Sequence, residues 1–305
     1  MEKTKKKKKK GNFVFIMIFV LGALVFLYPL ISRLYYRVES NEQVASYEKA
    51  KAELSEEEIQ KRMDLAQAFN DSLSNTGLED PYSKERYDKG RAEYARMLEV
   101  EEKIGHVEIP KVGQDLPIYA GTGPNILEKG VGHLEGTSLP IGGNSSHTVL
   151  TAHSGLPTAK LFTDLKDLKV GDKFYIHNIK ETLAYQVDQI KVVEPDNFND
   201  LLIVPGHDYA TLLTCTPIMI NTHRLLVRGH RVEYVKEAEE KLIAENKAAY
   251  MYKYLFYLAL LIIVVLLIMI RRQAKRSKLN EKKIKELSQS VLEIKDKENE
   301  EDKQI

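Results

Sequence analysis

Two long apolar stretches without a charged residue constrain this chain more than any other feature. The first, Phe13 to Ile31, reads FVFIMIFVLGALVFLYPLI, and the second, Tyr254 to Ile270, reads YLFYLALLIIVVLLIMI. A hydrocarbon core about 30 Å thick is crossed by about 20 residues of helix, so each stretch is close to spanning length. The sequence therefore predicts two transmembrane helices, at residues 13–32 and 254–270.

Each apolar stretch lies beside a basic cluster, which predicts its orientation in the membrane. Basic residues favour the cytoplasmic side, so the basic N-terminus (1–12) and the charged tail (271–305) are expected inside, and the segment between the spans outside. The two basic clusters, residues 1–10 and 271–278, hold 12 of the 45 basic residues and one of the 44 acidic ones, which leaves 33 basic and 43 acidic residues elsewhere. This acidic remainder argues against a nucleic-acid partner.

Other interpretations of the terminal segments remain open. The first stretch could be a signal peptide that is removed, although the SRLYYRVES that follows it offers no small-residue cleavage site. The second could be a buried core helix, although it is apolar all round and ends in RRQAKR. The tail after it is either a short helix or disordered.

Helical and loop patterns precede a region of strands in the outside segment. Residues 33–75 show helical spacing, with a capping box from Ser55 to Glu58 at the start of a second helix. That helix should bury an apolar face made of Ile59, Met63, Ala66 and Phe69. Residues 76–90 contain Gly77 and Pro81 and read as an exposed loop, and a short helical stretch is expected at about 88–100.

Residues 91–235 have the texture of a mainly β domain. At least seven short β-type runs lie between Gly, Pro, Asn and Asp residues, including IGHVEIP, LPIYAGT, HTVLTAH, ATLLTCTP and HRLLVRGHRVEYV. This pattern predicts a closed barrel or a sandwich and argues against a parallel βαβ sheet. Residues 236–253 are helical again and lead into the second span.

The only cysteine, Cys215, lies in ATLLTCTP, so no disulfide can form within the chain. On a strand, Thr211, Leu213 and Cys215 share one face, and Pro217 ends the strand, so the thiol should lie at a strand terminus. A thiol with a pKa near 8.5 needs a basic or cationic neighbour to act as a nucleophile. Otherwise such a cysteine is a small buried apolar residue, as lone cysteines often are.

Two residues are candidates for the neighbours of Cys215. His153, in TAHSGLP, lies where a strand-like run ends and a Gly/Pro turn begins. Arg224 follows Cys215 by nine residues, which suits a hairpin whose second strand begins beside the end of the first. An imidazole can exchange a proton with the thiol and a leaving amine, and a guanidinium is a permanent donor to an oxyanion. The spacing alone leaves open whether the three residues meet.

The motifs around these residues resemble a known family. TLLTCTP followed by NTHRLLVRGHR is similar to the signature of sortases, the surface transpeptidases of Gram-positive bacteria, and TAHSGLP resembles their histidine motif. The segments GVGHLEGTSLP and DLPIYAGT also look like sortase segments, and the resemblance runs from about Ile104 to Val235. It implies a closed sortase-type β-barrel in which Cys215 is the nucleophile, His153 the proton-transfer residue and Arg224 the oxyanion- or substrate-positioning residue.

Two further features resemble the pilus-associated class C of this family. That class carries a second, C-terminal span and a loop with an Asp-Pro-aromatic sequence that closes over the site as a lid. Here 254–270 supplies the span and Asp80-Pro81-Tyr82 supplies the loop. By resemblance, Asp80 would pair with Arg224 and Tyr82 would cover the Cys215 thiol. The alternative is that this tripeptide is an ordinary proline turn.

Two other residues are weaker candidates for the site. Thr214 is expected either to donate to the oxyanion or to satisfy a backbone group. His133, in the GVGHLEGT segment, is expected either to touch substrate or to be a structural histidine. None of the His, Asp and Glu spacings resembles a zinc site or a calcium loop, so neither metal nor cofactor is expected.

The resemblance implies an enzyme of the Gram-positive plasma membrane with its catalytic domain outside the cell. It would cleave an LPXTG-like sorting signal between Thr and Gly and join the acyl group to an amine, expected to be a lysine of a pilin subunit, and so polymerise pili. The alternatives are a housekeeping-type sortase that anchors proteins to peptidoglycan, an extracellular cysteine protease, or a non-catalytic membrane receptor that binds peptides.

Overall fold

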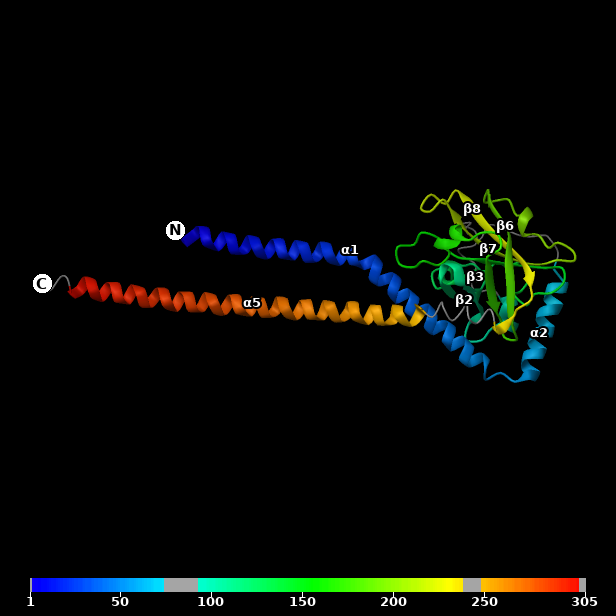
Figure 1. Ribbon diagram of the computed structural model, residues 1–305, viewed down its shortest axis with the longest axis horizontal. Coiled ribbons are helices and arrows are strands. Elements are labelled where there is room, and N and C mark those ends of the chain that lie inside the picture. The colour runs from blue at the N-terminus through cyan, green and yellow to red at the C-terminus, as the bar shows by residue number, and fades with distance from the viewer. Residues whose placement is uncertain (1, 74–92, 238–247, 302–305) are drawn as a thin grey trace. The chain divides into compact units, whose positions relative to one another are not determined.

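The computed structural model of this protein describes residues 2–73, 93–237 and 248–301 (Figure 1). The chain divides into two units, residues 1–253, which contain the β domain, and residues 254–305, which continue the last helix. The loop predicted at 76–90, with Asp80, Pro81 and Tyr82, and most of the helix predicted at 236–253 lie outside the described residues.

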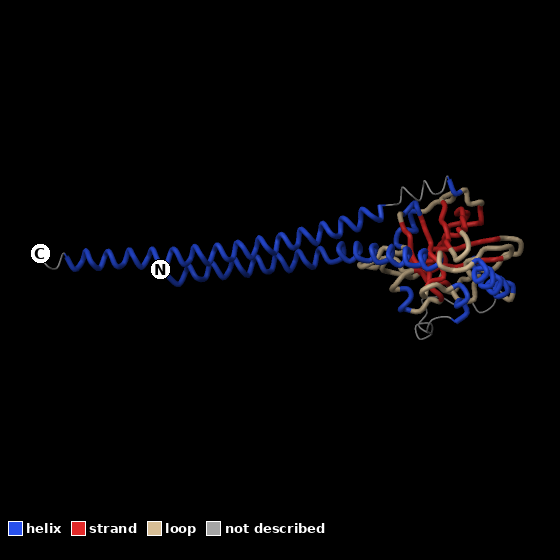
Figure 2. The backbone as a smooth tube through the Cα atoms, turned by 90° about the horizontal axis from the view of Figure 1, so that it is seen from below, coloured by secondary structure: helices blue, strands red, loops and turns tan. Residues whose placement is uncertain are grey.

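Eight strands of the first unit close into a barrel, which confirms the predicted mainly β fold (Figure 2). They are β1 (Lys103–Ile109), β2 (Gln114–Ala120), β3 (Val131–His133), β4 (Ser146–Thr151), β5 (Lys173–His177), β6 (Thr182–Val193), β7 (Asp208–Thr216) and β8 (His223–Val232). Around the barrel they follow the order β1-β2-β3-β4-β7-β8-β6-β5, and β5 pairs with β1 to close it. Closure gives each of these strands a neighbour on both sides.

Two neighbouring pairs in the barrel are parallel, β2 with β3 and β4 with β7, and the others are antiparallel. The pairing of β4 with β7 determines which residues can meet at the candidate site, because it brings the segment of His153 beside the strand of Cys215. Seven of the eight strands match the β-type runs of the sequence. The three-residue β3 lies in the glycine-rich GVGH segment and is too short for strand alternation to show.

Short helices connect the strands and cover parts of the barrel. They are α2 (Glu56–Asp71), α3 (Pro124–Leu127), and the 3-10 turns η2 (Glu93–Leu98), η3 (Pro110–Val112), η4 (Thr163–Asp167) and η5 (Asn199–Leu201). As predicted, Ser55 caps α2, accepting a hydrogen bond from the Glu58 N–H at 3.2 Å, and Met63 and Ala66 are buried. Asn70 fastens this helix to the barrel, since its amide accepts from the Leu139 N–H at 2.7 Å and donates to the Leu139 carbonyl at 3.3 Å.

The first helix, α1 (Glu2–Lys51), is longer than the sequence predicted. It joins the apolar stretch to the following helical segment without a break, because neither proline nor glycine occurs between residues 30 and 51. Its last turns contact β1 and β2 and bury Tyr47 in the barrel core.

Two helices among the described residues are long and apolar enough to cross a membrane, one over Met17–Lys51 and one over Leu255–Val291. Their apolar side chains are exposed, in contrast to those of a core helix. The second lies within α5 (Ala248–Glu301), which continues through the charged tail. The tail is therefore helical, as a continuation of α5 and not as the short helix that was one of the two alternatives.

Candidate active site

The Cys215 thiol lies near the end of β7, next to the start of β8. Cys215 is the second-last residue of β7 and pairs in register with Arg224, the second residue of β8. This is the hairpin geometry that the nine-residue spacing predicted. Both side chains are 7 % exposed, so they are held in fixed surroundings and still reach the surface.

His153 follows the strand on the other side of β7. The parallel register of β4 and β7 ends with Thr151 opposite Leu213, and the Ala152 N–H continues the pattern by donating to the Leu213 carbonyl at 3.3 Å. His153 and Cys215 each lie two residues beyond that last pair. They therefore leave the sheet at the same level, on strands about 4.8 Å apart.

Strand alternation places the three side chains on one face of the sheet. Alternate residues of β4, β7 and β8 pack into the barrel core, and the others form a separate cluster on the outer face with Leu134 and Leu201, namely Val149, Leu213 and Leu226. Cys215 is two residues after Leu213, and Arg224 is two residues before Leu226. Since Ala152 packs in the barrel core, alternation directs His153 to the outer face as well. The structure thus brings together the three residues that the sequence singled out.

Two side chains clasp the His153 and Cys215 segments together. The Thr214 hydroxyl donates to the Ala152 carbonyl at 2.7 Å, and the Ser154 hydroxyl donates to the Cys215 carbonyl at 2.6 Å. The last backbone hydrogen bond between the two segments is the one from Ala152 to the Leu213 carbonyl. The Cys215 carbonyl is the next acceptor along β7, and it receives its hydrogen bond from the Ser154 side chain in place of a backbone N–H.

The sequence analysis did not single out Ser154. The one signal available was a hydroxyl residue directly after His153 at the end of a strand, which does not predict a contact with Cys215. For Thr214 the bond to Ala152 favours the backbone-satisfying alternative, and strand alternation turns its side chain toward the barrel interior, away from the face of Cys215. Its contribution to the oxyanion stays a prediction.

Gly155 lets the segment after His153 meet the segment after Cys215. Its φ is +75°, in the region that favours glycine, and a Cβ at this position would lie 2.5 Å from the side chain of Ile218. Only glycine fits this close approach. The backbone of His153 itself is held by a hydrogen bond from the Phe162 N–H to its carbonyl at 3.1 Å.

The electrostatics suit proton transfer by His153 and anion binding by Arg224. Burial lowers the pKa of His153, and nearby Glu128 opposes that effect, so the neutral imidazole, which can accept a proton, is favoured. The Arg224 guanidinium donates from Nη1 to the carbonyls of Asn221 and His223, each at 3.1 Å. These bonds fix the planar donor group beside β7.

His133 is fully buried, on β3. Its Nε2–H donates to the Ser138 carbonyl at 2.8 Å, and burial lowers its pKa to about 4. This geometry favours the structural alternative that the sequence left open, and a contact between His133 and substrate stays a prediction. No group of three or more potential metal ligands occurs among the described residues.

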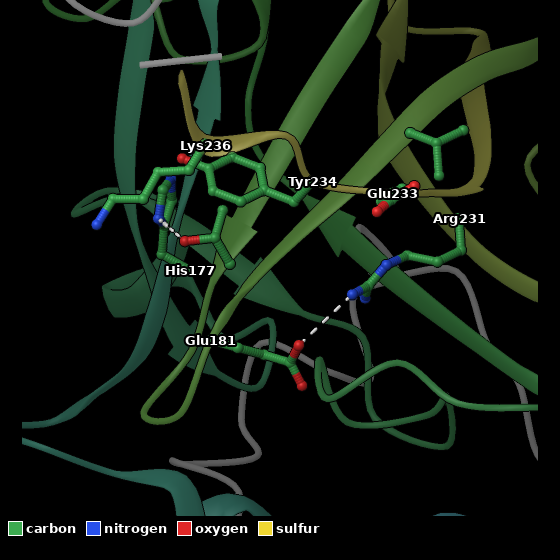
Figure 3. A pocket seen from close by; sticks show the side chains of 8 residues that line it. His177, Glu181, Arg231, Glu233, Tyr234 and Lys236 are labelled. Atoms are coloured by element: carbon green, nitrogen blue, oxygen red, sulfur yellow. Dashed lines mark hydrogen bonds and ion pairs between the residues drawn. The ribbon is translucent and has the colours of Figure 1, made fainter. Parts of the chain in front are cut away.

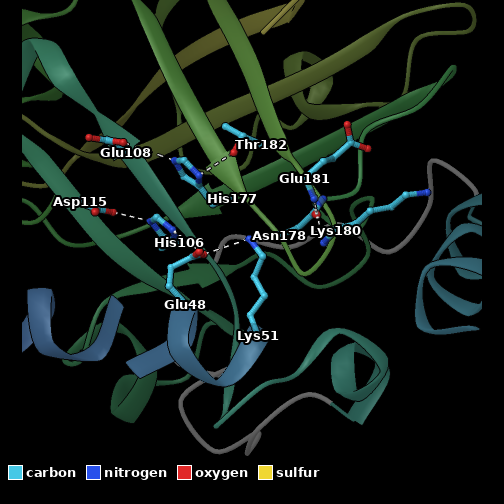
Figure 4. Close-up of polar contacts among 10 residues, drawn as sticks. All are labelled: Glu48, Lys51, His106, Glu108, Asp115, His177, Asn178, Lys180, Glu181 and Thr182. Carbon is cyan, nitrogen blue, oxygen red and sulfur yellow. Dashed lines mark hydrogen bonds and ion pairs between the residues drawn. The ribbon is translucent and has the colours of Figure 1, made fainter. Parts of the chain in front are cut away.

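A separate polar cluster lies on β1, β2 and β5, on the barrel side that contacts α1 (Figure 4). His106 bonds Asp115 of β2 at 2.7 Å and Glu48 of α1 at 3.3 Å, and its ring stacks on that of His177 with 4.1 Å between the centroids. Burial by itself lowers the pKa of His106, but the two carboxylates outweigh it and raise that pKa to about 9. A charged imidazolium therefore joins α1 to the barrel.

A hollow of about 850 Å³ opens beside this cluster and contains no residue of the candidate active site (Figure 3). His177, Glu181 and Arg231 line it, and Arg231 lies 3.6 Å from Glu181. Arg231 follows Arg224 by seven residues on β8, which corresponds to about 23 Å along a strand. The hollow is therefore at the other end of β8 from Cys215.

Comparisons with known proteins agree with this fold. The Sortase domain family matches residues 107–232. Sortase A of Bacillus anthracis is 26 % identical over 227 residues, which cover 74 % of this chain and 96 % of that protein. The crystal structure of sortase C-1 from Streptococcus pneumoniae is 71 % identical, with a TM-score of 0.63, and covers 64 % of this chain and 100 % of its own. A pilus-related sortase C of Group B Streptococcus is also 71 % identical, with a TM-score of 0.61, over 63 % of this chain and 97 % of its own.

The identity to these solved structures is high and extends over their whole length. The part that the family matches includes β7 and β8, which carry Cys215 and Arg224, and β4, which leads into His153. The chain belongs to the sortase family of cysteine transpeptidases, with a catalytic domain of the sortase C type.

Proposed function

We propose that this enzyme polymerises pilin subunits at the outer face of a Gram-positive plasma membrane. One observation carries the proposal: Cys215 and Arg224 are in register on β7 and β8, and the His153 segment is clasped to the other side of β7. This arrangement provides a nucleophile, a proton carrier and an anion donor on one face. The basic clusters at 1–12 and 271–278 support a topology with both termini in the cytoplasm and the barrel outside.

The first half-reaction forms a thioester. The Cys215 thiol gives its proton to His153 and its sulfur attacks the Thr carbonyl of an LPXTG-like signal, so that the carbonyl oxygen becomes an anion held by Arg224. When the oxyanion collapses, the Thr–Gly bond breaks and His153 returns the proton to the departing glycine amine. The products are the acyl-enzyme and the released C-terminal peptide.

The second half-reaction transfers the acyl group to an amine. A neutral lysine amine of another pilin attacks the thioester, His153 takes its proton, and the proton returns to sulfur as the thiolate leaves. The result is an isopeptide bond and a regenerated thiol. Two spans in one enzyme keep it in the same thin layer as membrane-tethered subunits, which raises the frequency of their encounters.

The Asp80-Pro81-Tyr82 loop is proposed to act as the lid. Arg224 lies at the edge of β8 beside Cys215, where an aspartate side chain from a covering loop would form a charge-assisted hydrogen bond with the guanidinium. Tyr82 would then shield the thiol, and the lid must open before a sorting signal enters.

The test is the intact mass of the soluble segment 37–250 after incubation with an LPXTG-type peptide. Wild type, Cys215→Ala, and the double variant Asp80→Ala/Tyr82→Ala are compared, with and without a lysine-containing acceptor. We expect an acyl adduct that Cys215→Ala abolishes, that the double variant accumulates faster, and that the acceptor converts to a cross-linked product. Absence of any adduct in the double variant would refute transpeptidation of this peptide class, and hydrolysis unaffected by the acceptor would favour a protease.

A further inference from the structure

Two apolar side chains protrude from the β7–β8 loop, residues 217–222, close to the candidate active site. Met219 is 79 % exposed and Ile220 is 66 % exposed, and they follow Cys215 by four and five residues. Apolar residues exposed singly need no explanation, but two adjacent ones beside a reactive site mark a candidate contact surface. The reaction steps described above give neither side chain a role.

The backbone of the β7–β8 loop holds these side chains outward. The N–H groups of Ile220 and Asn221 both donate to the Pro217 carbonyl, at 3.1 Å and 2.9 Å, and Arg224 donates to the Asn221 carbonyl at 3.1 Å. Met219 has a φ of +72°, a left-handed conformation that is costly for a residue with a long side chain. Such a conformation persists only where its surroundings fix it, so the exposed apolar pair is a built part of the fold.

The β7–β8 loop lies against the loop that follows His153, residues 154–160. A Cβ added to Gly155 would be 2.5 Å from the Ile218 side chain and 3.7 Å from the backbone nitrogen of Met219. The two loops therefore adjoin beside the candidate active site, since each follows one of its residues in the chain.

Both loops lack acidic residues. No Asp or Glu occurs in residues 151–163 or 209–232, although outside the two basic clusters the chain has 43 acidic and 33 basic residues. Anionic lipids give a membrane surface a negative potential, which repels carboxylates. The two loops therefore offer an apolar surface that can approach such a membrane.

Two hydrogen bonds from α1 fix the height of these loops above the membrane. Arg33 lies about 3 Å along the helix axis beyond the apolar stretch, and its Nε donates to the Pro157 carbonyl at 3.2 Å. Tyr36 lies about 8 Å along, and its hydroxyl donates to the Lys129 carbonyl at 2.7 Å. Lipid headgroups extend about 5 to 8 Å outside the hydrocarbon core, and tyrosine is typical of that layer. The loop after His153 is therefore at headgroup height.

The β7–β8 loop is on the same side of the barrel. In Figure 1 this loop, at the start of β8, is on the side from which α1 runs to its apolar stretch, and α2 is on the opposite side. A protein partner would have to displace lipid to contact Met219 and Ile220 at this height. The position therefore favours the bilayer itself as the partner of the exposed pair.

We propose that Met219 and Ile220 insert into the membrane surface beside α1, so that the entrance of the active site opens at the lipid headgroups. Insertion removes two apolar side chains from water. It also presents the thiol at the height where a membrane-tethered substrate leaves the bilayer. This inference rests on the span at 13–32 and on the outside barrel of the proposed function, and it does not depend on the chemistry of Cys215.

Depth measurements on the full-length protein in vesicles test the proposal. Because Cys215 is the only cysteine, Cys215→Ala gives a thiol-free background for Met219→Cys, Ile220→Cys or Leu65→Cys, each labelled with a nitrobenzoxadiazole fluorophore. Leu65 is the matched control, an apolar residue 52 % exposed on α2. The vesicles contain phosphatidylglycerol and phosphatidylcholine, part of it with a nitroxide at the headgroup end of the acyl chain. We expect the nitroxide to quench the labels at 219 and 220 at least about threefold more strongly than the label at 65. Equal quenching at all three positions overturns the proposal.

A second experiment keeps Cys215 and changes only the exposed pair. Met219→Gln/Ile220→Gln keeps the side-chain length at 219 and removes the apolar surface. We expect this variant to form the acyl adduct with a soluble LPXTG-type peptide as wild type does. With the same peptide fused to an apolar helix in vesicles, its rate of adduct formation should fall about tenfold, because the active site is no longer held at the surface.

The outcomes of the two experiments separate this inference from its alternatives. Equal loss of activity toward the soluble peptide would assign the pair to substrate binding and overturn the membrane role. An unchanged rate with the membrane-tethered peptide would overturn it as well. Strong quenching at 219 and 220 without any adduct in wild type would support the membrane contact and count against the proposed function alone.

Discussion

Replacing His106 by glutamine is expected to remove a pH-dependent part of the stability of the barrel. The imidazolium lies between Asp115 of β2 and Glu48 of α1, at 2.7 Å and 3.3 Å. The ring stacked on it, His177, has its pKa lowered by its own burial and by the charge on His106, so one ring of the pair carries the proton. Glutamine keeps a hydrogen-bonding group at this place but cannot carry the charge.

The size of the effect follows from the pKa of His106. It is about 9 in the folded protein, against an ordinary value of 6.5, so the bound proton stabilises the fold. This stabilisation is fully present below pH 6.5 and is lost as the pH rises through 9. The gap between the two values corresponds to about 3 kcal/mol, of which about 2 kcal/mol disappears between pH 7 and pH 9.

Few other groups with shifted pKa values interfere in that window. Burial lowers the pKa of His133 and of His147 to about 4, so their linkage to stability acts below pH 6.5. Burial raises the pKa of Tyr47 and of Tyr185 above their ordinary value, so these phenols act above about pH 10. The interval from pH 7 to pH 9 therefore reports mainly on His106.

The assay is urea unfolding of segment 37–250 at pH 7, 8 and 9. This segment keeps Glu48, Asp115 and the whole barrel and omits both apolar stretches, and solved relatives of similar extent cover 64 % of this chain. Wild type should lose about 2 kcal/mol of unfolding free energy across the range with an unchanged urea dependence, and His106→Gln should lose much less. The control His230→Gln, at an exposed histidine 3.9 Å from Asp188, should follow wild type. If His106→Gln follows wild type as well, the reasoning is refuted.

Three further substitutions test the clasp, the guanidinium and the docking of α2. Ser154→Ala removes the hydrogen bond to the Cys215 carbonyl, so we expect kcat to fall roughly tenfold with KM unchanged, and Ser154→Thr to restore kcat. If Ser154→Ala and wild type have equal kcat in peptide-cleavage kinetics, this hydrogen bond does not position the thiol. Arg224→Lys keeps the charge but loses the paired N–H donors of the planar guanidinium, so kcat for adduct formation should fall about 100-fold. A normal kcat in the Arg224→Lys variant would exclude oxyanion binding by the guanidinium. Asn70→Ala leaves the buried backbone groups of Leu139 without their side-chain partner and should lower the free energy of unfolding by about 2 kcal/mol in urea; a change below about 0.5 kcal/mol would contradict this docking role.

The part of the site made of neighbouring sequence could be predicted without a structure. Arg224 follows Cys215 by only nine residues, and Pro217 ends the strand that carries the thiol. A hairpin this short allows few registers, so the pairing of Cys215 with Arg224 could be predicted. Strand alternation likewise predicted the shared face of Thr211, Leu213 and Cys215. The cap of α2 was predictable for the same reason, since Ser55 and Glu58 lie within one turn.

The remaining part depends on contacts between distant segments. That β4 and β7 are parallel neighbours has no local signal, so a meeting of His153 with Cys215 could be expected only through the family resemblance. The Ser154 clasp depends on that pairing and was missed. The continuity of α1 through residue 33 was also missed, because the change from apolar to polar sequence at that point marks the membrane surface and does not end the helix.

The parallel pairing of β4 with β7 also determines when the enzyme acquires its reactivity. Thr214 and Ala152 are 62 residues apart in the chain, and β5 and β6 lie between their strands in the sequence. Because closing a long loop costs chain entropy before the contact is gained, we expect this pairing to form late in folding. An incompletely folded molecule would therefore have its cysteine without its histidine. We therefore expect the thiol to meet its proton acceptor only once β4 and β7 have paired.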